Sequence, residues 1–214
     1  MKNKGAVLIF SGCAGSGKGT VLAEIRKKSD RFRTTVSLTT RKPRPGEQEG
    51  VHYYYTTKEE FRKRVAAGDL VEYTEYCDNY YGTLQSELKR LADEGYIAVL
   101  EIETDGALQI MKKLPEHRSV FLAPPSYAEL EKRLRNRGTE TEEQITKRMA
   151  QAKEEILLSR HYRHLVINYD GAVDACADTV IALCLDQPLP ENNTLCKDKD
   201  GFPRRFLANE AEEQ

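Results

Sequence analysis

Four short stretches of the chain are almost entirely apolar, which is the pattern of strands covered on both faces. They lie at residues 5–10, 97–102, 119–122 and 165–167. Two further runs, at residues 34–38 and 70–76, are rich in β-branched or aromatic side chains and also predict strands. Residues 79–83, Asn-Tyr-Tyr-Gly-Thr, contain the turn formers asparagine and glycine and predict a turn before the next helix.

Between these strands the apolar residues recur at helical spacing. The clearest case follows Thr141, which forms a capping box with Gln144 ahead of a helix. The apolar positions in that helix lie on one face, and they are Ile145, Met149, Ala152 and Ile156. Similar patterns predict helices at about residues 18–29, 57–68, 84–95, 107–113, 126–134 and 172–184.

The repeated order of strand and helix predicts the α/β class, with a mostly parallel sheet and helices on both of its faces. Ligands then bind outside the carboxyl ends of the strands. Residues 34–95 have shorter strands and more tyrosines, so we interpret them as a lobe inserted into a core of residues 1–33 and 96–185. Prolines and asparagines interrupt all periodicity after residue 185, which predicts a solvated, flexible C-terminal extension over 186–214.

Composition narrows the choice of partners. The 214 residues allow a full core, and 33 Lys and Arg against 34 Asp and Glu leave a net charge of -1. The chain therefore has no excess of basic residues that would indicate nucleic-acid binding. No apolar run approaches the roughly 18 to 20 residues of a membrane span, and the chain enters its first strand without a signal-peptide core. We expect a cytoplasmic protein that binds neither nucleic acid nor membrane, of unknown oligomeric state.

The five cysteines are odd in number and widely scattered, which fits reduced thiols better than disulfides or zinc. They are Cys13, Cys77, Cys176, Cys184 and Cys196. Cys13 is the candidate for reactivity, because a helix N-terminus lowers the pKa of a thiol. A small space-filling role is the favoured alternative.

Residues 11–20, Ser-Gly-Cys-Ala-Gly-Ser-Gly-Lys-Gly-Thr, follow the first apolar strand and have the pattern of a phosphate-binding P-loop. Its glycines let successive N–H groups converge on phosphate oxygens, and Lys18 adds a positive charge. A helix beginning near Lys18 points its positive dipole end at the same anion. The predicted nucleotide site consists of Gly12, Cys13, Ala14, Gly15, Ser16, Gly17, Lys18, Gly19 and Thr20.

The metal ligand of this loop is left open by the sequence. The residue after the lysine is usually Ser or Thr, but here it is Gly19, with Thr20 one place later. Thr20, phosphate oxygens, or water held by Glu101 or Glu103 are the alternatives for Mg²⁺.

A second anion site is indicated by Arg41 and Arg44, three residues apart on a proline-stiffened loop. Guanidinium groups bind phosphate bidentately, and the hydroxyls of Ser37, Tyr53 and Tyr81 are candidate additional donors. Taken alone, the two arginines would favour the alternative of solvated charges on a flexible turn.

The pattern Thr39-Thr40-Arg41-x-x-Arg44-x-x-Glu47-x-x-Gly50-x-x-Tyr53, followed by Glu72 and by residues 79–83, resembles the acceptor site of guanylate kinases. The similarity runs over about residues 5–184. It implies a P-loop nucleoside kinase fold in a domain of residues 1–185. Residues 34–95 would form a GMP-binding lobe, and residues 135–150 a helical lid.

The resemblance implies transfer of the γ-phosphoryl group from ATP to GMP, with Mg²⁺ as cofactor. Residues matching Ser37, Arg41, Arg44, Tyr53 and Tyr81 hold the GMP phosphate in the family, and those matching Glu72, Thr83 and Glu101 read guanine. The chemistry agrees for Glu72, since a carboxylate accepts from guanine N1–H and its exocyclic amine but repels the N1 acceptor of adenine. On residue chemistry alone, Glu72 is also compatible with an outward charge on a strand.

Transfer to an anionic phosphate needs positioning and charge neutralisation more than a strong base. The resemblance assigns that role to Lys18 and to three arginines, Arg133, Arg137 and Arg148. It also assigns Asn168, together with Asp170, to the segment that meets adenine.

Two departures from the family pattern concern the end of the central strand. Glu101-Ile102-Glu103 stands where Asp-Ile-Asp is common, and Asp105-Gly106 where Gln-Gly is common. The charges at 101 and 103 are kept, but each side chain reaches one methylene further.

Two other functions stay open at this point. One is a kinase of another small phosphorylated acceptor, against which the tyrosines and Glu72 argue. The other is a non-catalytic interaction module, because guanylate-kinase-like domains also serve as peptide-binding units. Such modules typically lose the phosphate loop, whereas here Lys18 and the loop glycines are intact.

Overall fold

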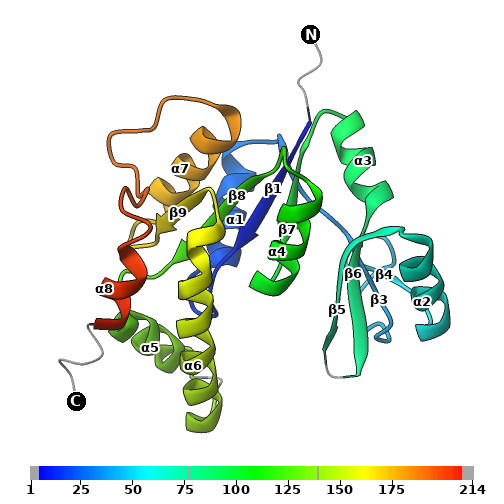
Figure 1. Ribbon diagram of the computed structural model, residues 1–214, viewed down its shortest axis with the longest axis horizontal. Helices are drawn as coiled ribbons and strands as arrows, with labels where there is room; N and C mark the ends of the chain where they lie inside the picture. The colour runs from blue at the N-terminus through cyan, green and yellow to red at the C-terminus, as the bar shows by residue number, and fades with distance from the viewer. Residues whose placement is uncertain (1–4, 77, 139, 209–214) are drawn as a thin grey trace. The chain divides into compact units, whose positions relative to one another are not determined.

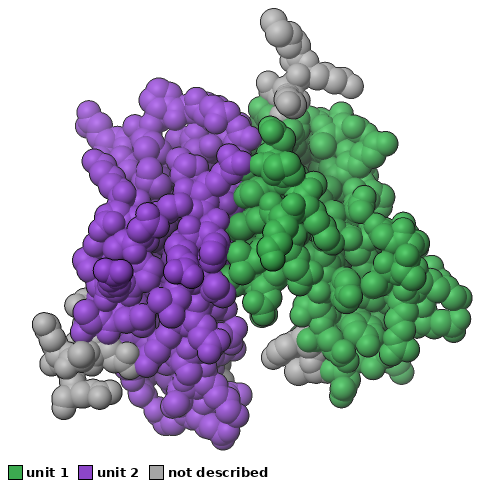
Figure 2. Space-filling model, in the orientation of Figure 1, with its two compact units in different colours: residues 1–9, 31–117 green, residues 10–30, 118–214 purple. Residues whose placement is uncertain are grey.

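The computed structural model describes residues 5–76, 78–138 and 140–208. Cys77 and Thr139, predicted as a reduced thiol and as part of the lid, lie outside the described residues. The chain divides into two compact units, each made of two segments (Figure 2). Unit 1 contains residues 1–9 and 31–117, and unit 2 contains residues 10–30 and 118–214.

The elements alternate along the chain much as the apolar pattern predicts (Figure 1). The strands are β1 Ala6–Ser11, β2 Phe32–Thr34, β3 Ser37–Thr39, β4 Tyr53–Tyr55, β5 Leu70–Tyr76, β6 Asn79–Leu84, β7 Ile97–Glu101, β8 Arg118–Ala123 and β9 His164–Ile167. The helices are α1 Lys18–Lys28, α2 Lys58–Ala67, α3 Gln85–Asp93, α4 Thr104–Lys113, α5 Tyr127–Asn136, α6 Glu142–Leu158, the 3₁₀ turn η1 Ser159–His161, α7 Val173–Leu185 and α8 Phe202–Ala208. Across the described ranges, every helix is too short or too polar to cross a bilayer.

The larger sheet has the strand order β2-β7-β1-β8-β9. Its pairs β2–β7 in unit 1 and β8–β9 in unit 2 are parallel. The apolar runs that predict these strands are buried, with Leu100, Phe121 and Leu165 all at 0% exposure. The predicted α/β class with a mostly parallel sheet is therefore confirmed.

A smaller sheet in unit 1 has the order β4-β3-β6-β5, with β3 parallel to β4 and antiparallel to β6. One of its faces packs on α2 through a cluster of Leu38, Phe61, Leu70 and Leu84 (Figure 1). The helix begins at a cap in which the Thr57 side chain accepts from an N–H of the first turn, as the sequence predicts.

The strand predicted at residues 34–38 is in fact two strands that belong to different sheets. The break falls at Thr35 and Val36. The Thr35 N–H donates to the carbonyl of Val99 at 3.0 Å, and the Val36 N–H donates to the Glu87 carboxylate at 3.4 Å. A continuous β-branched run predicts the extended backbone correctly, but it carries no information about where the chain changes sheets.

The turn predicted at residues 79–83 is wrong, because these residues form most of β6. The chain reverses just before them, where Asp78 has a φ of 59°. Gly82 lies within the strand because the neighbouring strand is very close: a Cβ there would be 2.8 Å from the carbonyl oxygen of Glu72. The glycine therefore marks a close backbone approach and not a turn.

The capping box before α6 is confirmed, with Thr141 and Gln144 each bonding the other's backbone N–H. The predicted buried face of this helix is also confirmed, and its residues are Ile145, Met149, Ala152 and Ile156. Local side-chain chemistry thus defined this helix without long-range information.

The C-terminal segment, residues 186–208, differs from the solvated extension expected from its composition. Leu195 forms an antiparallel bridge with Val166 of β9. In α8, Phe202 and Phe206 are buried, and the ring of Phe206 lies 6.0 Å from that of Tyr127 in α5. Figure 1 shows α8 beside α5 and α6. The segment is packed because two aromatic residues four apart give even this short helix an apolar face.

Candidate active site

The phosphate-binding loop, residues 11–20, connects β1 with α1 in unit 2. Residues 12–17 form the loop itself, and residues 18–20 form the first turn of the helix, as predicted. A Cβ on Gly12 would be 2.2 Å from the carbonyl oxygen of Leu122, and one on Gly17 would be 2.5 Å from Nδ2 of Asn168. Gly17 also has a φ of 90°. Both positions therefore require glycine.

Lys18 lies across this loop and donates from Nζ to two of its carbonyl oxygens. These belong to Gly12 and to Cys13, the latter at 3.3 Å. The first turn of α1 contains no acidic residue, so the positive end of the helix dipole and the ammonium group are not neutralised locally. This arrangement suits an anionic ligand such as a chain of phosphates.

Cys13 is fully buried within the loop. Burial raises the pKa of its thiol to about 12, so the reactive thiolate is absent at neutral pH. Cys176 and Cys184 are likewise buried free thiols, and Cys196 is a half-buried one. The structure favours the space-filling role for Cys13.

Gly19 and Thr20 are both exposed on the first turn of α1. A Cβ on Gly19 would meet no atom within 4 Å, so packing does not explain why this position lacks the usual hydroxyl. Within the described residues, no three His, Cys, Asp or Glu side chains converge closely enough to hold a metal ion. Magnesium bound beside phosphates commonly uses only one or two protein oxygens. The lack of a three-residue cluster among the described residues is therefore compatible with magnesium.

Arg133 of α5 is held by three oxygen partners, one in its own helix and two just after β9. Its Nε donates to Glu129 at 3.0 Å, and its Nη2 donates to the Asn168 carbonyl at 2.9 Å and to Asp170 at 2.8 Å. The Arg133 hydrogen bond lowers the pKa of the Asp170 carboxyl. The guanidinium therefore has a fixed orientation, with 18% of its side chain exposed.

The other two predicted arginines of this group lie elsewhere in unit 2. Arg137 is the exposed C-cap residue of α5. Arg148 lies on α6, where its Nε is 3.0 Å from a carboxylate oxygen of Glu140. Among the described residues, no hydrogen bond or ion pair joins either of them to Arg133.

Asn168, which the resemblance assigns to the segment that meets adenine, has a side chain that points into the protein. Only 5% of the residue is exposed. Its Nδ2 donates to the Ser16 carbonyl at 2.8 Å, and its Oδ1 accepts from the thiol of Cys176 at 3.6 Å. The side-chain amide of Asn168 is thus bonded to the phosphate-binding loop.

In unit 1, most of the predicted substrate residues share one face of the small sheet. Strand register pairs Ser37 with Tyr53, residue 39 with Tyr81, and Glu72 with Thr83. Side chains alternate along a strand, and the register of β5 shifts between Leu70 and Glu72, so this set lies on the face opposite the α2 cluster. We call it the polar face, made of Ser37, Thr39, Tyr53, Tyr55, Glu72, Thr74, Tyr81 and Thr83.

Arg41 lies against this face and is oriented by Glu47, a residue to which the sequence interpretation gave no role. Arg41 Nη2 is 2.7 Å from a Glu47 oxygen, and its guanidinium carbon is 5.3 Å from the ring centre of Tyr53. The backbone N–H of Arg44 and the hydroxyl of Tyr55 also donate to Glu47, each at 2.8 Å. These donors, Arg41 foremost, lower the pKa of Glu47 to about 2.

The signal that could have identified Glu47 is its spacing, three residues after Arg44 and six after Arg41, in a loop where a carboxylate can cross-link both. The side chain of Arg44 itself is exposed. The loop therefore presents one guanidinium fixed by Glu47 and one that projects into solvent.

Glu72 is a buried carboxylate, with 5% of the residue exposed. The Thr83 hydroxyl donates to its Oε1 at 2.8 Å. Burial raises the pKa of Glu72. The first turn of α4 lies against the other oxygen, since a Cβ on Gly106 would be 3.3 Å from Oε2. Glu101, predicted to join Glu72 in reading the base, ends β7 with an exposed side chain.

Comparisons with known proteins identify the family of this chain. A family model described as guanylate kinase matches residues 4–182. Curated guanylate kinases of Streptococcus pyogenes serotypes M3 and M18 are each 46% identical to this chain over 176 residues, which cover 82% of it and 83% of the relative. The crystal structure of guanylate kinase from Anaplasma phagocytophilum matches with a TM-score of 0.65 and 26% identity, covering 96% of this chain and 97% of that one.

Proposed function

Because this chain belongs to the guanylate kinase family, we propose that it transfers the γ-phosphoryl group of ATP to GMP, giving ADP and GDP. The observation that carries the choice of GMP is the buried Glu72 carboxylate, held by Thr83 on the polar face of unit 1. The phosphate-binding loop of unit 2 supports the choice of a nucleoside triphosphate as donor.

Glu72 would select guanine by hydrogen-bond polarity. Guanine offers two adjacent donors, N1–H and the exocyclic amine, to an ionised carboxylate, whereas adenine offers an acceptor at N1. Thr83 donates to Oε1 and so fixes the rotamer of the carboxylate. Adenine would leave this buried group unpaired, which is the most effective way for a site to reject a similar ligand.

The GMP phosphate would bind the arginines and hydroxyls of the same lobe. Arg41 supplies a planar guanidinium, Tyr53 and Tyr81 supply phenol groups, and Ser37 and Arg44 complete the set. Glu47 already orients Arg41, so little side-chain entropy is lost when the phosphate binds.

On the donor side, the loop N–H groups and Lys18 would bind the β- and γ-phosphates. Arg133, Arg137 and Arg148 would neutralise charge that develops on the transferred group. An anionic phosphate oxygen is already a competent nucleophile, so this chain needs to supply position and positive charge and no strong general base. Asn168 supports this site by holding the Ser16 carbonyl, which is a structural task.

Magnesium is the cofactor implied by this reaction. When bound, it would supply positive charge that offsets the charge of the donor phosphates. The oxygen donors that this chain offers are the hydroxyl of Thr20 and the exposed carboxylates of Glu101 and Glu103, acting directly or through water. We also propose a cytoplasmic location, supported by the free thiols at Cys13, Cys176, Cys184 and Cys196.

The test is a coupled ADP-release assay with ATP and each of GMP, dGMP, AMP, CMP and UMP. We expect turnover with GMP and at least a roughly hundredfold lower kcat/KM with AMP, because the unpaired carboxylate penalises adenine. Equal turnover with AMP would refute the guanine assignment. No turnover with any acceptor would instead favour the non-catalytic interaction module.

A further inference from the structure

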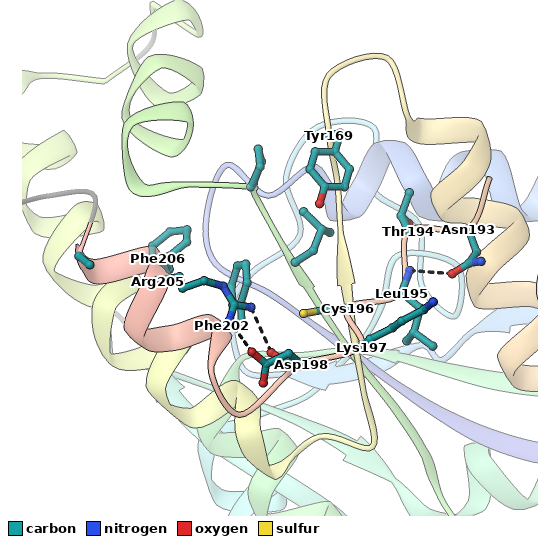
Figure 3. Close-up of a pocket in the computed structure, with 13 residues that line it drawn as sticks. Tyr169, Asn193, Thr194, Leu195, Cys196, Lys197, Asp198, Phe202, Arg205 and Phe206 are labelled. Carbon is teal, nitrogen blue, oxygen red and sulfur yellow. Dashed lines mark hydrogen bonds and ion pairs between the residues drawn. The ribbon is translucent and has the colours of Figure 1, made fainter. Parts of the chain in front are cut away.

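A cavity of about 540 Å³ in unit 2 lies between the C-terminal segment and the residues that follow β8 and β9. Figure 3 shows Tyr169, from the loop after β9, on one side of it and Phe202, Arg205 and Phe206 of α8 on another. Thr194 is part of the cavity wall. The family match ends at residue 182, so Thr194 and the other wall residues of the C-terminal segment lie outside the part of the chain that the family model covers.

Thr194 is fixed beside β9 by backbone hydrogen bonds. The Ile167 N–H donates to the Thr194 carbonyl at 2.9 Å, and the Cys196 N–H donates to the Leu165 carbonyl at 2.8 Å. The Thr194 N–H donates to the Thr179 hydroxyl at 3.1 Å. With 8% exposure, Thr194 is a buried residue whose orientation is set on both sides.

The Thr194 hydroxyl continues these contacts inward, donating to Sγ of Cys176 at 3.3 Å. The Cys176 thiol in turn lies 3.6 Å from Oδ1 of Asn168. Burial raises the pKa of Cys176, so its sulfur keeps its one proton, which two neighbouring acceptors share: Oδ1 of Asn168 and, at 3.5 Å, the carbonyl of Ile167. A hydroxyl in the C-terminal segment is thereby connected to the buried amide of Asn168.

The amide of Asn168 passes this contact to the phosphate-binding loop. The Ser16 carbonyl can only accept, so Nδ2 faces it and Oδ1 faces Cys176. Gly17, the next residue, is so close to Nδ2 that a Cβ there would be 2.5 Å away. Any movement of the Asn168 amide is therefore transmitted to the loop directly before Lys18.

We propose that Thr194 is a positioning residue for the phosphate-binding loop, acting through Cys176 and Asn168 on the Ser16 carbonyl. It touches no substrate. It fixes the loop backbone so that the N–H groups before Lys18 converge on the donor phosphates. The proposal rests on the proposed function only in naming ATP as the donor, because loop geometry governs the binding of any nucleoside di- or triphosphate.

The test replaces Thr194 by valine, which keeps the shape and removes the hydroxyl. We expect KM for ATP, and the Kd of ADP measured by calorimetry, to rise roughly 3- to 10-fold, the loss of one hydrogen bond, with KM for GMP changed less than about twofold. Thr194→Ser keeps the hydroxyl donor that Thr194→Val removes, so it should keep the wild-type affinity for ATP. A lower melting temperature with unchanged ADP affinity, or equal losses for both substrates, would overturn the proposal.

Two further variants keep the result interpretable. Cys176→Ala removes the middle contact, and the double variant Thr194→Val/Cys176→Ala should bind ADP no more weakly than Cys176→Ala alone; additive losses would contradict a shared path. Asp198→Asn is the matched control, because it breaks the Asp198–Arg205 ion pair of the same segment without touching Thr194. Asp198→Asn should leave ADP affinity unchanged. A loss of ADP affinity equal to that of Thr194→Val would mean that Thr194 acts only by helping the C-terminal segment to pack.

The two proposals fail in different ways. If the wild-type chain binds ADP in a Thr194-dependent manner but shows no GMP-dependent turnover, the proposed function fails and the role of Thr194 stands. If GMP-dependent turnover is normal but ADP affinity does not depend on Thr194, the role of Thr194 fails and the proposed function stands. A wild-type chain that does not bind ADP would overturn both.

Discussion

The phosphate-binding loop and the polar face are built in opposite ways. The loop binds through its backbone, so its essential feature is space: Gly12 and Gly17 are required because Leu122 and Asn168 lie within 3 Å of where a Cβ would be. The polar face binds through side chains that strand register brings together, such as Glu72 beside Thr83. A substitution in the loop should therefore disturb all of its backbone contacts to phosphate together, whereas a substitution on the polar face should remove one interaction at a time.

The largest effect is expected for Lys18→Met. It removes the one side-chain charge that lies across the loop, and the loss of such a donor costs roughly 10²- to 10³-fold in kcat. GMP affinity should stay within about twofold of wild type. Steady-state kinetics with calorimetric titration of GMP measures both. A comparable loss of GMP affinity would erase the division between donor and acceptor residues.

Next in size is Glu72→Gln. It removes the acceptor for guanine, so kcat/KM for GMP should fall roughly 10- to 100-fold while discrimination against AMP weakens. The free energy of unfolding of this variant should instead be higher than that of the wild type. The folded-state pKa of Glu72 is raised, so the folded protein loses stability as pH rises through that value and the carboxylate ionises in the interior. The variant lacks this loss, and its advantage in urea unfolding should grow with pH.

The same shift predicts a pH dependence of GMP binding in the wild type. As pH falls through the raised pKa, Glu72 takes up a proton and KM for GMP should rise, at a pH above that of an ordinary glutamate. Glu47, with a pKa of about 2, should stay ionised throughout. A KM for GMP with the same pH dependence in the wild type and the glutamine variant would argue against Glu72 as the base-reading group.

A smaller effect is expected for Arg41→Ala. Its guanidinium is held by Glu47 and stacked near Tyr53, with 15% of the side chain exposed, and we expect KM for GMP to rise roughly tenfold with KM for ATP unchanged. Arg62→Ala is the matched control, since Arg62 lies over Tyr80, whose ring packs on the opposite face of the same sheet. An equal effect of the two variants would mean that charge alone, and not the polar face, attracts GMP.

The smallest effect compares one alanine in each region. Gly19→Ala enters open space in α1 and should stabilise the protein by up to about 1 kcal/mol without harming ATP binding. In Gly106→Ala, the new Cβ would be 3.3 Å from Oε2 of Glu72, so KM for GMP should rise modestly. Thermal unfolding and kinetics of both variants test this. A rise in KM for ATP with Gly19→Ala would show that position 19 in the first turn of α1 tolerates no side chain.

The comparison also explains what the sequence could predict. Spacing along the chain identifies the loop and the capped helix α6, because the residues that decide them are within a few positions of one another. The shared face of Ser37, Tyr53 and Glu72 depends on the register of four strands, which no local pattern contains; only family resemblance grouped these residues. Residues 79–83 were misassigned because Gly82 serves a close contact with the paired strand β5, which a local turn pattern does not reveal.

Two other features that the sequence did not reveal have the same origin. The inward orientation of Asn168 depends on Cys176 and on the Ser16 carbonyl, and neither contact follows from the motif that contains Asn168. The C-terminal segment was taken as solvated because its prolines and asparagines outweighed the spacing of Phe202 and Phe206. That spacing was the available signal, and its partner ring, Tyr127, is far away in sequence.

The bond between Asn168 and Ser16 also has a consequence for how the chain matures. The two residues are 152 positions apart, so at ~5–20 residues per second the ribosome adds Asn168 roughly 8 to 30 s after Ser16. Throughout that interval the earliest motif to be translated lacks the partner that holds its backbone. Stalled nascent chains that end before β9 should therefore fail to bind ADP, and nucleotide capture becomes one of the last properties that the growing polypeptide acquires.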